Sequence, residues 1–148
     1  MKFSLNKLLR KSEKAVTSSQ DSVDEIIKNI EHIPFGISEA NVLYAGLNEL
    51  GGYYFFQTVI VGSFQMKVKN GAQLIVFSHD FELQLQSDML ELESDHTDIT
   101  GRYITKIDFQ IEEVDAAKIK RSSIKEIHLK SKKQGVTFSM YELSEEEA

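Results

Sequence analysis

Residues Tyr103–Glu112 read YITKIDFQIE, and their side chains alternate between two kinds. One face carries Tyr103, Thr105, Ile107, Phe109 and Ile111, and the other carries Lys106, Asp108, Gln110 and Glu112, with Ile104 as its apolar exception. A period of two is typical of a β-strand with one face on a core and one face in water. Because stretches on both sides also alternate, we expect this strand to lie within an antiparallel sheet.

The alternation covers most of the chain after Gly52. Further strands are predicted at Tyr53–Val61, Phe64–Lys69, Ala72–Ser78, Phe81–Gln86, Leu90–Glu93, Ile124–Lys130 and Val136–Glu142. Asn70–Gly71 favours a hairpin between residues 64–69 and 72–78, because both residues tolerate the positive φ angles of a type I′ turn. Val114–Arg121 breaks the alternation and predicts a helical turn.

Helical spacing dominates the first 50 residues. Residues 4–16 have an apolar stripe, and residues 1–16 carry five basic side chains, which predicts a short basic amphipathic helix over residues 4–16. Such a helix can contact a partner or a membrane surface. Packing of its stripe on the domain is the interpretation we favour, because one short stripe is weak evidence for a membrane-binding function.

Two more helices are predicted before Gly52. Ser22 and Glu25 have the spacing of a capping box, and an apolar stripe follows up to Pro34, which would end the helix. A third helix is expected from Ser38 to Leu50, with Gly51–Gly52 as its C-terminal cap.

These elements predict an α+β fold in one domain, residues 1–148. Residues 1–50 form its helical part, residues 51–142 its antiparallel β part, and residues 143–148 an acidic tail. The expected β part is a meander of seven or eight strands. Such a sheet must curl to bury its inner face, which gives a sandwich or an open barrel.

Composition narrows the functional classes. The chain has a net charge of −6, with 41% hydrophobic and 27% charged residues, as expected for a folded globular protein. It contains no cysteine, which excludes disulfides, thiol nucleophiles and thiolate zinc sites.

No apolar run reaches the roughly 18–20 residues of a transmembrane helix, and we find no signal peptide. We therefore expect a cytoplasmic protein, and its acidic charge argues against nucleic acid as a partner.

No catalytic motif or cofactor fingerprint is present. The best candidate for a cation site or a hydrolytic site is the loop that contains Asp95, His96 and Asp98, because carboxylates bind hard cations and an Asp–His pair can move protons. The alternative is a solvated loop, since Asp and Thr are common turn residues. We favour the solvated loop without a site, and we predict neither a metal nor a cofactor.

Two further groups of residues are candidates for binding. Tyr53, Phe55 and Phe109 would line a pocket for a small apolar ligand if the sheet closes, but we favour a dense core strand as the explanation of these residues. The basic hairpin contributes Lys125, Lys130, Lys132 and Lys133, which can contact an acidic partner. We favour the alternative, a solvated turn whose lysines deter strand pairing at an edge.

The leading functional hypothesis is a non-enzymatic module for protein interaction or self-association. It depends on the lack of catalytic motifs and on the segregation of charge along the chain. A carrier or sensor of a small apolar ligand is the second hypothesis, and a hydrolase or cation site at Asp95–Asp98 is the third.

Overall fold

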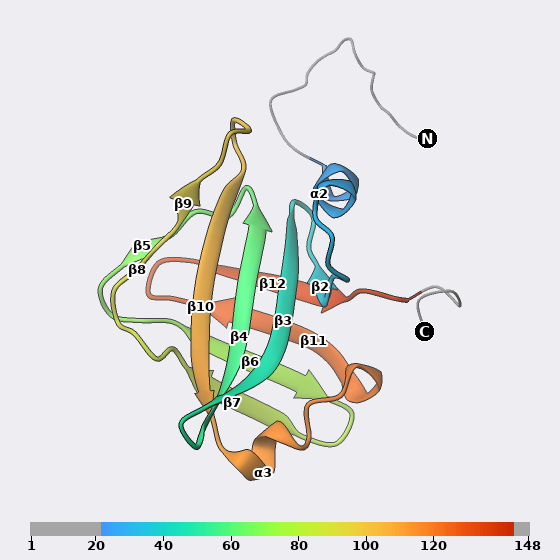
Figure 1. The fold of residues 1–148 in the computed structure, drawn as a ribbon, viewed down its shortest axis with the longest axis vertical. Helices are drawn as coiled ribbons and strands as arrows, with labels where there is room; N and C mark the ends of the chain where they lie inside the picture. The colour runs from blue at the N-terminus through green and yellow to red at the C-terminus, as the bar shows by residue number, and fades with distance from the viewer. Residues whose placement is uncertain (1–21, 144–148) are drawn as a thin grey trace.

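The computed structural model describes residues 22–143, and most of them belong to antiparallel β structure (Figure 1). The helices are α2 (Val23–Asn29), α3 (Glu113–Ala116) and the 3-10 helix η2 (Arg121–Ser123). The strands are β2 (Gly36–Ile37), β3 (Asn41–Leu50), β4 (Tyr53–Gly62), β5 (Lys67–Val68), β6 (Gln73–Ser78), β7 (Glu82–Gln86), β8 (Leu92–Glu93), β9 (Asp95–His96), β10 (Tyr103–Ile111), β11 (Ile124–Lys130) and β12 (Gly135–Met140). The helix expected over residues 4–16 and the tail after residue 143 lie outside the described residues.

Nine of these strands form one curled sheet in the described part of the chain. Its order is β7-β6-β11-β12-β2-β3-β4-β10-β9, and β5 and β8 form a separate two-stranded ribbon. Strands β3, β4 and β10 run along the long axis, and β6, β7, β11 and β12 cross behind them (Figure 1). The expected β-rich α+β architecture and its approximate number of strands are therefore confirmed.

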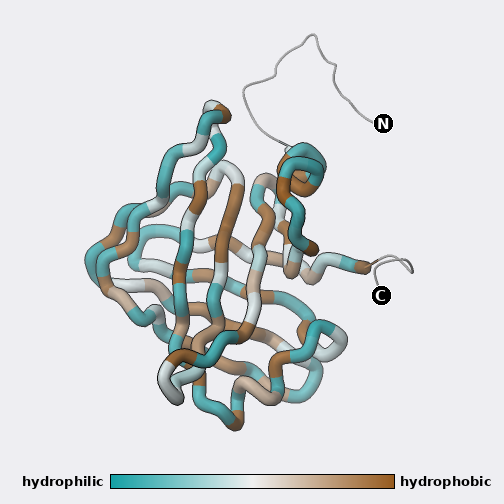
Figure 2. Tube along the Cα trace, in the orientation of Figure 1, coloured by the Kyte–Doolittle hydropathy of each residue, from teal (hydrophilic) through white to brown (hydrophobic). Residues whose placement is uncertain are grey.

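The predicted strand over residues 103–112 is β10, and its alternation is confirmed by burial. Thr105, Ile107, Phe109 and Ile111 are buried, whereas the residues between them are exposed. Figure 2 shows the corresponding alternation of hydropathy along the strands. The buried face of β10 belongs to the main core, together with residues of the crossing strands such as Phe138. The two groups of strands thus share one hydrophobic interior.

The open side of the curled sheet is bridged after β7. Ser87 forms an isolated β-bridge with Phe109, and the backbone N–H of Asp88 donates to the carbonyl of Asp108 at 2.8 Å. The chain then leaves the edge of β10, and β9 pairs with that edge again at Tyr103. The segment between Ser87 and β9 supplies β8 to the separate ribbon.

Helix α2 covers the outer face of the sheet. Ser22 caps it, because its hydroxyl accepts from the backbone N–H of Glu25 at 3.1 Å, as the sequence predicts. Ile26 is completely buried against Val42 and Val61 in a second, smaller core. The helix ends at Asn29, and the chain is extended from Ile30, so it is shorter than expected.

The helix predicted from Ser38 to Leu50 is wrong, because residues 41–50 form strand β3. Leu43, Leu47 and Leu50 fit a helical stripe, but Val42 and Tyr44, on either side of Leu43, are buried beside α2 on the other face of the sheet. Burial on both faces hides the period of two. Gly51 and Gly52, with φ angles of 61° and 87°, form the tight turn between β3 and β4.

The connectivity also differs from the predicted meander. Asn70–Gly71 does not join two paired strands, because β5 pairs with β8, while β6 pairs with β7 and β11. The N–H of Gly71 donates instead to the carbonyl of Leu90 at 2.8 Å. The turn signal is local, whereas the choice of partner strand depends on contacts far away in the sequence.

The hairpin of β11 and β12 and the helical turn before it occur where the sequence predicts them. In residues 22–143 no helix has both the length and the apolar character needed to cross a membrane.

Replacement of Gly62 by alanine tests the close approach of β4 to the chain before β3. A Cβ atom at Gly62 would collide with the carbonyl oxygen of Ala40 and the side chain of Asn41. We expect Gly62→Ala to lower the free energy of unfolding by about 2–3 kcal/mol, as measured by urea denaturation. Gly46→Ala is the control, because a Cβ there meets open space, and it should be neutral or slightly stabilising. Equal losses in both variants would contradict the packing described here.

Replacement of Tyr44 by phenylalanine tests the buried phenol beside α2. Burial raises the pKa of Tyr44 above its ordinary value of 10.0, although the positive charge of Arg102 opposes the shift and Tyr141 adds to it. The unfolded chain therefore loses this proton at a lower pH than the folded protein, so the contribution to stability is present below about pH 10 and is lost as the pH rises through the folded pKa.

Within the described residues the Tyr44 hydroxyl has no hydrogen-bond partner. Tyr44→Phe should therefore leave the free energy of unfolding at pH 7 unchanged, or raise it by up to about 1 kcal/mol. It should also flatten the decline in stability above pH 10, measured by urea denaturation at a series of pH values. A large loss at pH 7 would show that the hydroxyl is needed.

Candidate functional site

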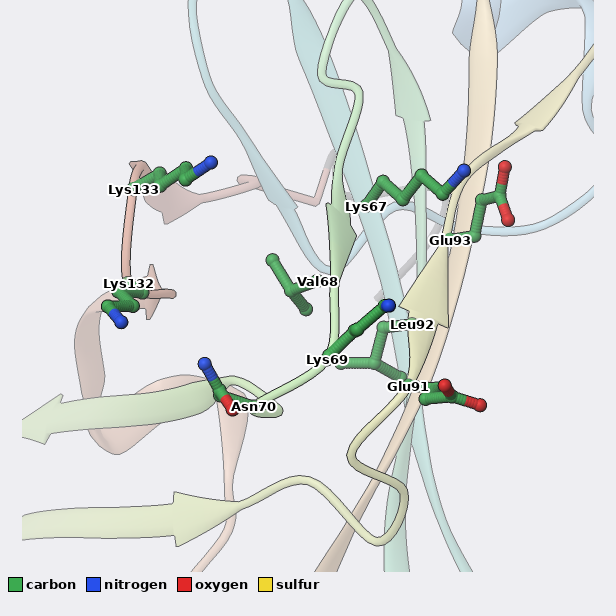
Figure 3. Close-up of a pocket in the computed structure, with 9 residues that line it drawn as sticks. All are labelled: Lys67, Val68, Lys69, Asn70, Glu91, Leu92, Glu93, Lys132 and Lys133. Atoms are coloured by element: carbon green, nitrogen blue, oxygen red, sulfur yellow. The ribbon is translucent and has the colours of Figure 1, made fainter.

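Lysines from two distant parts of the chain line one cleft. In Figure 3 the side chains of Lys67 and Lys69 extend toward the β8 side, and Lys132 and Lys133 lie across the gap. The cleft has a volume of about 620 Å³, which is within the range of ligand sites. Its lining consists of Lys67, Val68, Lys69, Asn70, Glu91, Leu92, Glu93, Lys132 and Lys133. We call it the lysine cleft.

The loop between β11 and β12 forms one wall of the lysine cleft. Ser131 and Gln134 close this loop, because the N–H of Ser131 donates to the carbonyl of Gln134 at 2.8 Å and the Ser131 hydroxyl donates to the same oxygen at 3.1 Å. The side-chain amide of Gln134 then donates to the carbonyl of Gln65 at 2.8 Å. This bond joins the loop to the segment just before β5, so the loop that carries Lys132 and Lys133 lies across the cleft from the ribbon.

The ribbon of β5 and β8 forms the opposite wall. Lys67 lies opposite Glu93, and Val68 lies opposite Leu92. Ser94 anchors the ribbon: its N–H donates to the carbonyl of Met66 at 2.9 Å, and its hydroxyl accepts from the Met66 N–H at 2.9 Å. The same hydroxyl lies 2.6 Å from that of Thr105 on β10.

Residues on both strands of the ribbon also reach the main core. Leu92 is buried in this core, and Val68 packs against it. The ribbon is therefore held by hydrophobic packing as well as by hydrogen bonds, and the lysines project from a fixed support.

The net charge of the residues that line the cleft has the opposite sign to the net charge of the whole chain. Four lysines and two glutamates line it, a formal net charge of +2, whereas the chain carries −6. The two glutamates belong to the β8 side, and Figure 3 shows Lys132 and Lys133 on the opposite side. In the described part of the chain, no ion pair involves any of the four lysines. The cleft can therefore attract carboxylate or phosphate groups, while Val68 and Leu92 add a small apolar surface.

The structure separates the four lysines predicted as partner contacts. Lys132 and Lys133 line the cleft, whereas Lys125 and Lys130 are exposed on β11 outside its lining. Sequence analysis missed Lys67 and Lys69. Both lie on the polar face of an alternating stretch, but nothing in the sequence indicates that this stretch lies beside the loop at 131–134.

The aromatic candidates do not converge on one cavity. Tyr53 is 73% exposed at the start of β4, whereas Phe109 is completely buried in the main core. Phe56 is the residue that pairs with Phe109, so the adjacent Phe55 points to the outer face of the sheet. Tyr53 and Phe55 therefore share the outer face of β4, whereas Phe109 lies on the inner face.

The candidate residues of the acidic loop are only partly in a loop, because Asp95 and His96 form strand β9 and Asp98 lies in the turn between β9 and β10. Asp95, His96 and Asp98 are exposed, and the His96 ring packs on Tyr103 with a centroid distance of 5.2 Å. The hydroxyl of Thr97 bonds to the backbone of residues on the other side of the turn. In residues 22–143 no three His, Cys, Asp or Glu side chains come together in an arrangement suited to a metal ion.

No protein-family model, curated protein or solved structure matches this chain. The functional argument therefore depends on the geometry and charge of the sites themselves. Among the sites described above, the lysine cleft combines a ligand-sized volume with a net charge opposite to that of the protein.

Replacement of Gln134 by alanine tests whether its side chain holds the wall of the cleft. We expect faster amide hydrogen exchange in residues 131–135 of Gln134→Ala, because the bond to Gln65 is lost. The main-chain bond from Ser131 to residue 134 remains, so the hairpin itself should persist. Gln110→Ala is the control, since it removes a side-chain bond to Asp88 elsewhere. Unchanged exchange in the loop would mean that the Gln134 amide does not restrain it.

Proposed function

We propose that the protein is a non-enzymatic interaction module whose lysine cleft binds an acidic segment of a partner protein. The observation that carries this proposal is that Lys67 and Lys69 line the same cleft as Lys132 and Lys133 in a protein whose net charge is negative. These residues come from segments that are far apart in the sequence. A run of solvated lysines in a single turn would not require such an arrangement.

The expected contribution of these lysines is mainly to the rate and specificity of association. Exposed charges at a binding surface steer a ligand of opposite sign, and like charges elsewhere on the surface repel it from other sites. The chain as a whole carries a net charge of −6, so an acidic segment needs a local concentration of positive charge to approach it. Binding should weaken as salt rises, because the Debye length falls from about 10 Å at 0.1 M to about 3 Å at 1 M.

The geometry gives less support to the two alternatives. A carrier needs an interior that can admit a ligand, but Phe56, Phe109 and Phe138 are completely buried inside the curled sheet and pack into one core. A hydrolase or cation site at Asp95–Asp98 needs convergent side chains, but adjacent residues of β9 point to opposite faces. We also propose a cytoplasmic location, which is consistent with a chain that has no cysteine.

A charge-matched pair of double variants tests the proposed function. The probe is a fluorescent peptide with the sequence Gly-Ser-Glu-Leu-Glu-Ser-Gly, and its binding is followed by fluorescence anisotropy or, at millimolar concentrations, by NMR titration. Lys132→Gln with Lys133→Gln should weaken binding about tenfold, since each exposed ionic contact contributes up to about 1 kcal/mol.

Lys125→Gln with Lys130→Gln is the control, because it removes the same charge from the same hairpin outside the cleft. This variant should change the affinity by less than about twofold. Equal weakening in both double variants, or no binding of the peptide at millimolar concentration, would overturn the proposal.

A further inference from the structure

The two edges of β5 differ in their hydrogen bonding. Met66 and Val68 direct their backbone groups toward β8, because the carbonyl of Met66 accepts from Ser94 and the register is that of a regular antiparallel pair. The backbone groups of Lys67 and Lys69 must therefore point to the other edge. In the described part of the chain these groups have no hydrogen-bond partner, and the ribbon has no third strand.

The free edge of β5 faces the lysine cleft. The carbonyl of Gln65 lies on this same edge and already accepts a bond from Gln134 of the opposite wall. Two residues further on, Lys67 and Lys69 present the next groups of the edge, and both line the cleft. Unpaired strand edges are templates for the addition of an extended peptide, which gains main-chain hydrogen bonds there.

Strand β8 shows which side chains suit β5. Glu93 lies opposite Lys67, Leu92 lies opposite Val68, and continuation of the register places Glu91 opposite Lys69. Directly opposite residues of an antiparallel pair share a face of the sheet. An acidic–apolar–acidic triplet therefore puts its carboxylates on the lysine face and its apolar side chain on the Val68 face. The free edge of β5 carries the same three residues.

We infer that a partner segment with the pattern acidic–apolar–acidic adds to the free edge of β5 as a third, antiparallel strand of the ribbon. This inference rests on the proposed function and specifies its ligand. The two acidic residues lie opposite Lys67 and Lys69 and exchange backbone hydrogen bonds with them. The N–H of the central apolar residue points away from β5. Lys132 and Lys133 add positive charge from the other side of the cleft (Figure 3).

N-methylation of single peptide bonds tests this geometry, because a methyl group removes one backbone donor without changing the charge. The parent probe is again Gly-Ser-Glu-Leu-Glu-Ser-Gly. Methylation of the amide nitrogen of either glutamate should weaken binding at least tenfold, since that N–H faces β5. Methylation of the leucine nitrogen is the matched control, and we expect a change of less than about twofold. A peptide with the core Glu-Glu-Leu has the same composition but the wrong pattern, and it should also bind at least tenfold more weakly.

Protection of the protein backbone provides the second measurement. In NMR hydrogen-exchange experiments, the parent peptide should slow exchange of the Lys67 and Lys69 amides and leave those of Lys125 and Lys130 unchanged. Equal effects of all three N-methyl groups, with binding still dependent on Lys132 and Lys133, would overturn strand addition and leave the proposed function standing. Sensitivity to N-methylation without dependence on those lysines would overturn the proposed function instead.

Discussion

Burial of the inner face of the curled sheet is the constraint on which the rest of this structure depends. Where β4 and β10 pair, Phe56 lies opposite Phe109, and both rings are almost completely removed from water. Burial of one such ring contributes about 1.5–3 kcal/mol. Thr58 lies in the same layer, and its hydroxyl donates to the carbonyl of Ile107 at 2.7 Å, so the polar atom is satisfied. The crossing strands can then pack on this layer without leaving an orphaned polar group.

The outer face of the same strands is covered only in part. Helix α2 lies over Val42 and Val61, but it is only two turns long and ends at Asn29. Toward the hairpin of β3 and β4, Leu50 and Tyr53 remain more than half exposed. Strand β3 is therefore buried on both faces where α2 covers it, and it is exposed toward the hairpin, where α2 does not reach.

This difference along β3 explains how far local sequence patterns could predict the fold. Strand β10 has one face in the core and one in water, so its alternation identifies it directly. Strand β3 is buried on both faces over Val42, Leu43 and Tyr44 and exposed from Gly46 onward. Its apolar residues therefore follow helical spacing by coincidence.

Only two of the four lysines that line the cleft could be predicted from the sequence. Lys132 and Lys133 stand out because they lie side by side in a turn, which is a local signal. Lys67 and Lys69 join them only because β5 leaves the main sheet, pairs with β8 and is joined to the loop through Gln134. Such long-range pairing depends on the whole fold and leaves no mark in the local pattern. The turn signal at Asn70–Gly71 even favours a different partner for this strand.

The lysines on β5 affect both the protection of its free edge and the strand addition that we propose. A free strand edge invites pairing with any extended chain, and lysine side chains on such an edge are a common protection because they repel one another and remain hydrated. On β5 the lysines alternate with Val68, whose side chain reaches the core. Apolar or basic strands would gain backbone hydrogen bonds at this edge but would leave the ammonium groups desolvated or opposed by like charge. A strand that supplies carboxylates at alternate positions offsets the cost of desolvating the ammonium groups. Strand β8 has this pattern on the other edge, where Glu93 lies opposite Lys67. In the strand addition that we propose, the charges that protect the edge from indiscriminate pairing therefore also select the added strand.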